Sequence, residues 1–164
     1  RSAARKTEAL KRLIKKKNFQ SVIAGIRRDE EGTRAKERVF SPRGTDAEWD
    51  FKQQPPEFWD QYKTDFPAGT HIRVHPILAW TELDIWRYIQ REHIPVVPLY
   101  FSNKGKRYRS LGDHDITFPV SSSASNVDEI IIELESTKIA ERSGRAMDHE
   151  GENAFERLRT DGYM

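Results

Sequence analysis

Residues 21–28 read Ser-Val-Ile-Ala-Gly-Ile-Arg-Arg, a short apolar run that ends at a glycine and leads directly into two arginines. A continuous apolar run of this kind is typical of a buried parallel strand. Just before it, apolar residues recur at helical spacing over residues 7–17 and predict an amphipathic helix that stops near Asn18. Because a helix leading into a buried strand is half of an α/β unit, this stretch predicts an α/β fold.

A dense polar stretch, residues 27–38, follows the predicted strand. In open α/β sheets, ligands bind just outside the carboxyl ends of the strands, which is where Arg27 and Arg28 come. A guanidinium group donates two parallel hydrogen bonds to a phosphate or a sulfate, and it keeps its charge at any relevant pH. We therefore expect these two arginines to contact an oxyanion. The alternative is a network of ion pairs at the surface.

Five neighbours of the arginine pair extend this candidate site. Arg34 and Lys36 follow it by one or two turns and could converge on the same oxyanion. Asp29 and Glu30 could orient the guanidinium groups or join the coordination shell of a magnesium ion. Gly25, two residues before Arg27, gives the backbone freedom at the strand end.

A second basic cluster lies further along the chain and is flanked by the aromatic residues Tyr100, Phe101 and Tyr108. Its members are Lys104, Lys106, Arg107 and Arg109. The cluster is either a flexible phosphate clamp or a solubilising loop, and spacing alone leaves both interpretations open.

Between these clusters the sequence predicts irregular structure. Residues 41–69 carry four prolines and six aromatic side chains, which predict a long excursion with one helical turn over residues 57–62. A strand-like run follows at residues 72–78 and is broken by Pro76. Residues 96–101 should be extended, and their proline keeps them out of the middle of a sheet.

Two capped helices are expected in the second half. Thr81 with Asp84 three residues later forms a variant of the capping box, and the buried face of this helix should consist of Leu83, Trp86, Tyr88 and Ile89. The other helix should start at Ser125, with Asp128 three residues later, and bury Val127, Ile130, Ile131 and Leu134. The polar tail over residues 141–164 should be loosely packed or wrap a neighbour.

The composition excludes several classes of function. The 164 residues include no cysteine, so these residues supply no disulfide, thiolate metal site, iron–sulfur cluster or thiol nucleophile. No apolar run is long enough for a membrane span and no signal peptide is recognisable, so we expect a cytoplasmic protein with no membrane partner.

The net charge of +2 conceals an asymmetry. Residues 1–43 contain 14 basic and 5 acidic side chains, whereas residues 44–164 contain 14 basic and 21 acidic ones. The basic part could face nucleic acid or the phosphates of a small nucleotide.

Metal-binding and common catalytic motifs are absent. None of the five histidines shows the spacing of a metal-ligand set, so we expect no metal site. His114 lies between Asp113 and Asp115, and an ordinary surface turn is the simpler interpretation of this triplet. The motifs typical of serine hydrolases, P-loop proteins and dinucleotide-binding folds do not occur.

Residues 25–41 closely resemble the segment Gly-x-Arg-Arg-Asp-Glu-Glu-x-x-Arg-Ala-Lys-Glu-Arg of the family of sulfate adenylyltransferase subunit 2 proteins. These are the small, ATP-using subunits of heterodimeric bacterial ATP sulfurylases, within the branch of proteins similar to phosphoadenosine phosphosulfate (PAPS) reductase. The resemblance continues in the same order through residues 75–89, 94–100, 107–112 and 141–149 and the closing Gly162-Tyr163. It therefore covers most of the chain.

This resemblance implies a Rossmann-like fold of the adenine-nucleotide α-hydrolase (PP-loop) type, in which helices flank a parallel sheet. Residues 1–110 would be the C-terminal part of that α/β domain, and residues 111–164 a C-terminal helix and wrapping tail. The implied reaction is a nucleotidyl transfer, in which ATP, expected with Mg²⁺, and sulfate give adenosine 5′-phosphosulfate and pyrophosphate for sulfate assimilation and cysteine biosynthesis. The implied partner is a GTPase large subunit.

By the same resemblance, Arg27 and Arg28 would be catalytic, lying beside the triphosphate and the incoming sulfate. Their role would be electrostatic: holding a weak nucleophile against the α-phosphorus and stabilising charge on the leaving pyrophosphate. The nucleotide-binding residues would be Gly25, Asp29, Glu30, Arg34, Lys36, Arg107 and Arg109.

The sequence departs from the family pattern in two places. The PP-loop, a Ser-Gly-Gly-Lys-Asp-Ser type of turn that cradles the ATP phosphates, is not among these residues, so we expect them to be part of a longer chain and inactive by themselves. Residues 111–115 carry Asp113 where many relatives carry cysteine after the glycine, and no role is assigned to that loop.

Two other functions compete with this hypothesis. A PAPS or adenylyl-sulfate reductase of the same superfamily needs a cysteine nucleophile, which these residues lack. A noncatalytic module could use the basic front to bind phosphate or nucleic acid, in which case its affinity would fall steeply with salt. The distribution of charge favours small phosphates and sulfate, so we expect no nucleic-acid partner.

Overall fold

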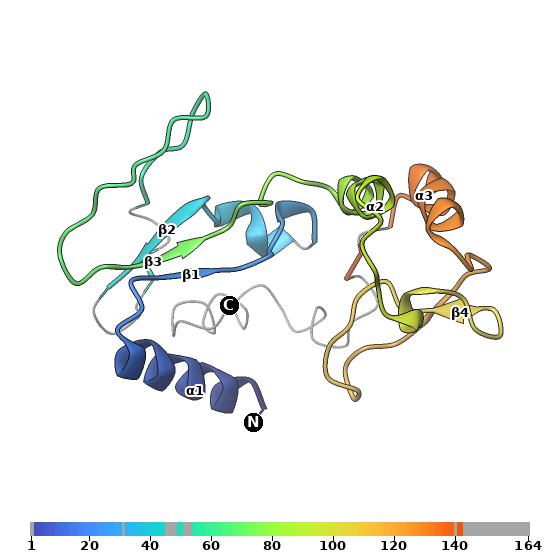
Figure 1. Cartoon of the computed structure of the whole chain (residues 1–164), viewed down its shortest axis with the longest axis horizontal. Coiled ribbons are helices and arrows are strands. Elements are labelled where there is room, and N and C mark those ends of the chain that lie inside the picture. Colours follow the sequence, from blue (N-terminus) through green and yellow to red (C-terminus); the bar gives the residue numbers. More distant parts are fainter. Residues whose placement is uncertain (1, 31, 45–48, 51–53, 140, 143–164) are drawn as a thin grey trace. The chain divides into compact units, whose positions relative to one another are not determined.

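The structure is a computed structural model of the chain (Figure 1), and it describes residues 2–30, 32–44, 49–50, 54–139 and 141–142. Its contacts divide the chain into two compact units. The first, here called the sheet unit, takes residues Arg1–Ile26 and Lys36–Leu78. The second, here called the helical unit, takes residues Arg27–Ala35 and the described chain from Ala79 onward. None of the described helices is long and apolar enough to cross a membrane.

The sheet unit begins with helix α1 (Ser2–Lys17), which leads into strand β1 (Ser21–Ile23) as predicted. The helix ends where it was expected to end, because Asn18 adopts a left-handed conformation with φ of 52°. The Phe19 N–H then donates to the Ile14 carbonyl at 3.2 Å, which satisfies one of the last carbonyls of the helix.

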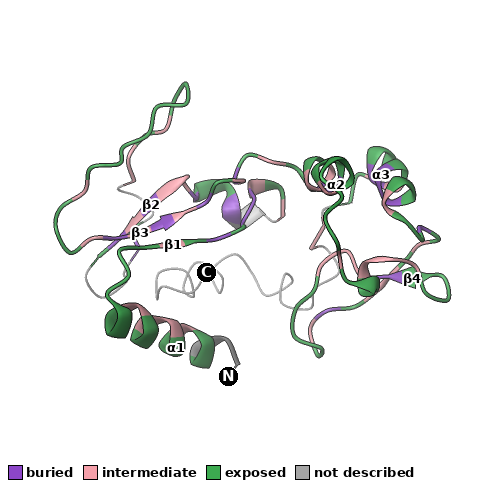
Figure 2. Ribbon diagram, viewed as in Figure 1, coloured by how far each residue is buried: buried purple, intermediate pink, exposed green. Residues whose placement is uncertain are grey.

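Three strands form the sheet in the order β1-β3-β2. β1 pairs in parallel with β3 (His71–Val74), while β2 (Phe40–Arg43) pairs antiparallel to β3. The α/β character is confirmed, but the described sheet is mixed rather than fully parallel. Figure 2 shows buried residues on the central strand β3, and a small apolar core of Ala24, Ile26 and Leu78 packs beside Val39.

The predicted helical turn over residues 57–62 is wrong. Phe58 and Gln61 instead form an antiparallel bridge, and the two residues between them, Trp59 and Asp60, have φ of 51° and 58°. Two consecutive residues of positive φ make a hairpin turn and cannot continue a right-handed helix. The carboxylate of Glu57 accepts hydrogen bonds from the backbone N–H groups of Val39 and Phe40, which ties this segment to the start of β2.

The helical unit is built around α2 (Glu82–Arg91) and α3 (Val127–Ser136). Both halves of the capping box between Thr81 and Asp84 are present. The predicted start of α3 is off by one residue, because Asn126 is its N-cap and Ser125 binds the carboxylate of Glu129 instead. The helices share one apolar core, whose buried members are Trp86, Ala124, Ile130, Ile131 and Leu134.

Two other expectations for this unit need correction. Tyr88 is 37% exposed and packs edge-on against Trp80 instead of entering the core. Residues 96–101 are not all extended, because Pro98–Tyr100 form a 3₁₀ turn, η3, in which proline suits the first position.

The remaining elements of the helical unit are short. η1 (Arg28–Glu30) and η2 (Gly32–Lys36, whose last residue belongs to the sheet unit) are 3₁₀ turns. β4 (Lys106–Arg107) pairs antiparallel to β5 (Val120–Ser121). The domain boundary expected between residues 110 and 111 stays a prediction, although α2 and α3, on either side of it, share one core. The expected tail lies almost wholly outside the described residues.

Candidate functional site

Arg27 is held in place by carboxylates of its own unit. Its side chain is almost fully buried, its Nε donates to Asp29 Oδ1 at 2.9 Å, and its Nη2 forms an ion pair with Glu141 Oε2. The 3₁₀ turn η1 brings Asp29 and Glu30 back towards Arg27, and Glu30 Oε1 accepts from the Arg27 backbone N–H at 2.6 Å. The guanidinium group is therefore fixed before any ligand binds.

Asp29 also contacts the N-terminus of α2. Its Oδ2 accepts from the backbone N–H of Glu82, the first residue of that helix, at 2.5 Å. The first N–H groups of a helix have no partner within the helix, and the helix dipole favours a negative charge there. Asp29 thus links Arg27 to the N-terminus of α2, and a helix N-terminus is a position that favours binding of a phosphate or a sulfate.

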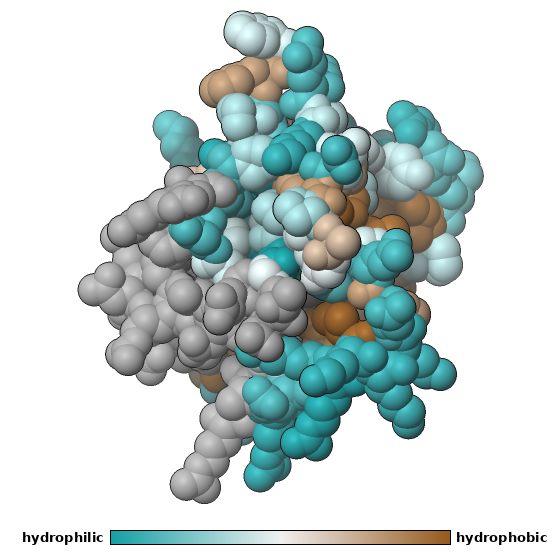
Figure 3. Space-filling model, turned by 90° about the vertical axis from the view of Figure 1, so that its left-hand side faces the viewer, coloured by the Kyte–Doolittle hydropathy of each residue, from teal (hydrophilic) through white to brown (hydrophobic). Residues whose placement is uncertain are grey.

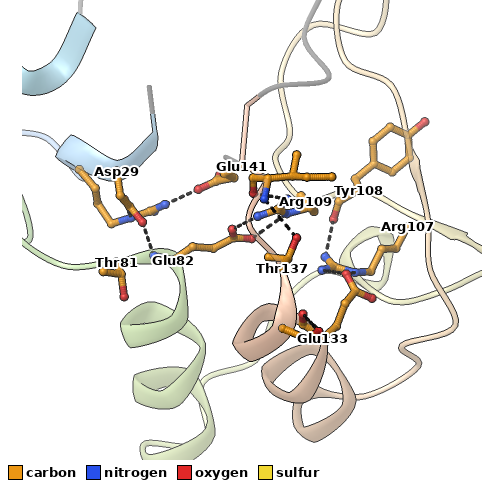
Figure 4. Close-up of polar contacts among 12 residues, drawn as sticks. Asp29, Thr81, Glu82, Arg107, Tyr108, Arg109, Glu133, Thr137 and Glu141 are labelled. Atoms are coloured by element: carbon orange, nitrogen blue, oxygen red, sulfur yellow. Dashed lines mark hydrogen bonds and ion pairs between the residues drawn. The ribbon is translucent and has the colours of Figure 1, made fainter. Parts of the chain in front are cut away.

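The side chain of Glu82 continues this line of contacts to Arg109. Glu82 is itself buried, and its two carboxylate oxygens accept from Nε and Nη2 of Arg109. The Nη1 group of Arg109 donates to the Ile139 carbonyl at 2.9 Å. Figure 4 shows Asp29, Glu82 and Arg109 following one another, with Glu141 close to them.

Glu141 and Arg142 complete what is called here the arginine–carboxylate cluster, which consists of Arg27, Asp29, Glu30, Glu82, Arg109, Glu141 and Arg142. Arg142 Nη1 lies 3.5 Å from Glu30 Oε2. Burial raises the pKa of the Glu141 carboxyl, and the charges of Glu82 and Glu30 raise it further, against the opposing effect of Arg27. For Arg27, burial lowers the pKa, but Glu141 and Asp29 outweigh it and the pKa is raised.

The sequence of residues 2–119 matches the phosphoadenosine phosphosulfate reductase domain. The chain belongs to this family. The match contains the cluster residues from Arg27 to Arg109 and ends before Glu141 and Arg142. The family resemblance of the sequence is thereby confirmed.

Within the phosphoadenosine phosphosulfate reductase family, the chain is similar to proteins named sulfate adenylyltransferase subunit 2. It is 38% identical over 188 aligned positions to that of Maricaulis maris, 39% identical to that of Geotalea uraniireducens and 40% identical to that of Caulobacter sp.. Each alignment covers 97% of this chain and 62% of the relative. The chain therefore spans less than two thirds of the length of these relatives.

Four of the nine site residues predicted from the sequence belong to the arginine–carboxylate cluster: Arg27, Asp29, Glu30 and Arg109. Arg28 lies in η1 next to them, is half-buried and makes contacts of its own. Arg34 is buried in η2, within the same helical unit.

Gly25 and Lys36 belong to the sheet unit. Lys36 is exposed, and its carbonyl accepts from Gln54 Nε2 at 2.6 Å. A Cβ atom added at Gly25 would lie 3.8 Å from Ile77 Cδ1, an ordinary contact, and Gly25 has no positive φ. The backbone at this position therefore does not require the freedom of glycine that the sequence suggested.

Arg107 is held apart from the cluster. It is 1% exposed, its Nε and Nη2 both donate to Glu133 Oε1, and its Nη1 donates to the Tyr108 carbonyl, as Figure 4 shows. Successive residues of a strand point to opposite sides, so β4 buries Arg107 and exposes Lys106. The basic segment over residues 104–109 therefore does not act as one flexible clamp, and binding of a nucleotide by Arg107 stays a prediction.

Sequence reasoning missed three members of the cluster. Glu82 carried a local signal, since it is an acidic residue at the first position of a capped helix. Glu141 and Arg142 carried no local signal, because only the fold brings them to Arg27 and Glu30.

Metal binding finds no support among the residues that the structure describes. They contain no group of three or more His, Asp or Glu side chains that could hold an ion. Asp29 and Glu30 were expected to orient guanidinium groups or to join a magnesium shell, and in the structure both contact Arg27, Asp29 at the guanidinium group and Glu30 at the backbone N–H. His114 is exposed, and its Nδ1 lies 3.1 Å from Oδ1 of Asp115.

Proposed function

We propose that the protein containing this chain transfers the adenylyl group of ATP to sulfate, giving adenosine 5′-phosphosulfate and pyrophosphate. The observation that carries this proposal is the continuous line of contacts from Arg27 through Asp29 and the N-terminus of α2 to Glu82 and Arg109. It supplies two oriented guanidinium groups and a helix N-terminus to one small volume, which suits polyanionic substrates.

The chemistry requires little more than this arrangement. An oxygen of sulfate attacks the α-phosphorus of ATP, the bond from that phosphorus to the bridging oxygen of the β-phosphate breaks, and the electron pair leaves with pyrophosphate. Sulfate is fully deprotonated at neutral pH, so no base has to remove a proton from it. The work of the protein is to hold two anions together and to stabilise charge on the leaving group.

Named residues receive roles on this basis. Arg27, Arg28 and Arg109 hold phosphate and sulfate oxygens, while Asp29 and Glu82 fix the directions of the Arg27 and Arg109 guanidinium groups. Arg34 is a further candidate for phosphate binding from the same unit. Gly25, Lys36 and Arg107 remain weaker candidates for nucleotide binding, because none of them joins the cluster.

A magnesium ion, if it enters with ATP, would be bound mainly by the phosphates. Asp29 and Glu82 of the arginine–carboxylate cluster bind arginines, and the described residues contain no group of three or more His, Asp or Glu side chains that could hold an ion.

The assembly and location of the protein are part of the same proposal. The relatives are named subunit 2, which indicates that they work with another subunit. We take that partner to be the GTPase large subunit implied by the family resemblance, and we place the complex in the cytoplasm, where ATP is available.

The proposal is tested by measuring pyrophosphate release in the protein that carries this chain, purified with any subunit that accompanies it. Release should require ATP and sulfate together, and adenosine 5′-phosphosulfate should form in equal amount. The 164 residues alone should show no turnover, and turnover by them alone would contradict our expectation that a PP-loop is required.

Two outcomes would replace this function. Release of sulfite from phosphoadenosine phosphosulfate and a dithiol would assign a reductase, and its cysteine would have to come from outside these residues. Binding of RNA or DNA with a steep dependence on salt, without pyrophosphate release, would assign a nucleic-acid-binding module.

A further inference from the structure

The sheet unit contains a cavity that the proposed function does not use. It has a volume of about 750 Å³ and lies between α1 and residues 64–72. Gln20, His71 and Ile72 line it, and they stand just before or at the first residues of β1 and β3. The cavity is therefore at the opposite end of these strands from Gly25, where the chain continues towards Arg27.

One wall of the cavity is a well-defined turn. The Thr70 N–H donates to the Pro67 carbonyl at 3.1 Å, and Gly69 within this turn has φ of 85°. A turn of this kind needs glycine at its third position, because a side chain there would be strained. The wall is thus shaped by local backbone geometry and does not depend on a ligand.

His71 lies at the edge of this cavity. The residue is 8% exposed, and its two ring nitrogens are buried, so they do not face the cavity. Its place is fixed by β3, where it pairs with Arg43 of β2. Burial lowers the pKa of the His71 ring, and the charges of Arg73 and Arg43 lower it further.

The rim of the cavity is positively charged. Lys11 and Lys15 lie four residues apart on α1, so both face the same side of the helix. In the part of the chain that the structure describes, neither lysine pairs with a carboxylate, and Asp65 is the single acidic residue of the lining.

The lining mixes apolar side chains, among them Ile14, Phe19, Phe66 and Ile72, with polar ones such as Asn18, Gln20 and Thr64. Figure 3 looks onto this side of the molecule: hydrophilic side chains of α1 occupy its lower part, with hydrophobic surface directly above them. Phe19 is half-exposed although it is a large apolar side chain, so a ligand could cover it.

We propose that this cavity binds a small amphiphilic anion, whose apolar or aromatic body lies against Phe19 and Phe66 and whose anionic group lies near Lys11 and Lys15. The volume is within the usual range for small-molecule sites. Two aromatic side chains beside two lysines suit a ligand that has both an apolar and an anionic part.

Calorimetric titration of the full chain with phenyl phosphate tests this proposal, with inorganic phosphate and phenol as partial probes. Phenyl phosphate should bind with 1:1 stoichiometry and at least about tenfold more tightly than either partial probe. Equal affinity for inorganic phosphate would overturn the amphiphilic character of the site, and the absence of saturable binding would overturn the site itself.

Paired variants of α1 locate the binding. The double substitution Lys11→Gln with Lys15→Gln should weaken phenyl phosphate at least about tenfold. The matched control, Arg12→Gln with Lys16→Gln, removes the same charge at the same spacing from positions that do not line the cavity, and it should change the affinity less than about twofold. Equal weakening by both pairs would show non-specific attraction to a basic helix and would contradict the proposal.

Backbone amide signals give a readout that is independent of affinity. On saturation with phenyl phosphate, the ¹H and ¹⁵N resonances of the Gly69 and Thr70 amides, in the turn that forms one wall of the cavity, should shift, while those of the exposed His114 amide should not. Binding that leaves the Gly69 and Thr70 resonances unmoved would place the probe elsewhere, for example at the arginine–carboxylate cluster, and would overturn the assignment.

Discussion

Arg27 and Glu141 lie 114 residues apart in the sequence and form an ion pair between Nη2 and Oε2. Asp29 occupies the Nε side of the same guanidinium group. The helical unit thus supplies its own anions at the positions where the proposed function requires oxygens of phosphate or sulfate. Asp29 is tied to α2 as well, whereas Glu141 carries a raised pKa and is the ligand that an incoming oxyanion would replace.

Replacement of Glu141 by glutamine is the first test of this interpretation. Glu141→Gln keeps an oxygen beside Arg27 but removes the competing charge, so affinity for pyrophosphate should rise by about three- to tenfold, equivalent to about 1 kcal/mol. Wild-type affinity should also rise as the pH falls towards the raised pKa of Glu141, and the variant should lack that rise. Calorimetric titration measures both effects.

The matched control for this substitution is Glu135→Gln. Glu135 pairs with Arg87 in the same unit, but both side chains are about half exposed, so its loss should leave the affinity unchanged. Weaker binding of pyrophosphate by Glu141→Gln would mean that Glu141 organises Arg27 and does not compete with the ligand.

Substitution of Arg107 should affect stability and leave anion binding unchanged. Arg107→Met removes a fully buried guanidinium group that pairs with Glu133, which is itself about a third exposed and also bonded by Ser122, so the loss of these charged hydrogen bonds should cost about 1.5–3 kcal/mol. Urea denaturation should show this decrease, while pyrophosphate affinity of the folded variant stays within about twofold of wild type. A large loss of affinity with unchanged stability would return Arg107 to the binding site.

Two buried histidines, one in β3 and one directly after it, predict that the folded protein loses stability in acid. Burial lowers the pKa of His71 and of His75, whose Nδ1 lies 2.7 Å from the Arg38 carbonyl. The unfolded chain therefore takes up protons on these rings first as the pH falls below about 6.5, and stability decreases until the folded-state pKa values are reached. Each histidine contributes a loss of up to about 2 kcal/mol between pH 6.5 and pH 5.

Variants separate this effect from general acid denaturation. His75→Asn keeps a donor for the Arg38 carbonyl but cannot titrate, so the decrease in unfolding free energy between pH 7 and pH 5 should be smaller than in wild type. His114→Asn, at a fully exposed site, should leave the decrease unchanged. An identical pH dependence in wild type and His75→Asn would contradict the prediction.

The capping box of α2 also makes stability depend on pH, but here the Asp84 carboxylate stabilises the helix only while it is charged. Hydrogen bonds from the backbone and side chain of Thr81 lower the pKa of Asp84. Its stabilisation is therefore present above the unfolded pKa of about 3.9 and is lost as the pH falls through the lower folded value. Asp84→Asn should cost about 0.5 kcal/mol at pH 7 and much less at pH 2.5, as followed by urea denaturation.

Features that depend on neighbouring residues could be predicted from the sequence. The capping box of Thr81 and Asp84 is one example, and another is the end of α1 at Asn18, because each is decided within a few positions of the chain. The buried face of α3 was also predictable, since Ile130, Ile131 and Leu134 recur at helical spacing.

Other features could not be predicted, for identifiable reasons. Trp59 and Asp60 form a turn with positive φ, and although aspartate is common in turns, a bulky tryptophan is not expected at positive φ. The two-residue strand β4 is too short for its alternation to be read, so the burial of Arg107 was hidden. The contact of Arg27 with Glu141 depends on the fold of the whole helical unit, so the sequence could indicate Arg27 but not the carboxylates that hold it.

The most direct test of the central claim is the rate at which adenosine 5′-phosphosulfate forms from ATP and labelled sulfate in arginine variants of the complete protein. Arg28→Ala should lower the rate at least about 100-fold while the protein stays folded. Arg27→Lys keeps a charge for Glu141 but loses the planar guanidinium group, and it should lower the rate by at least the same factor. Arg87→Ala, at an exposed ion pair, should stay within about twofold of wild type. Unchanged turnover in both the Arg27 and the Arg28 variants would remove this strand end from the site and contradict the account.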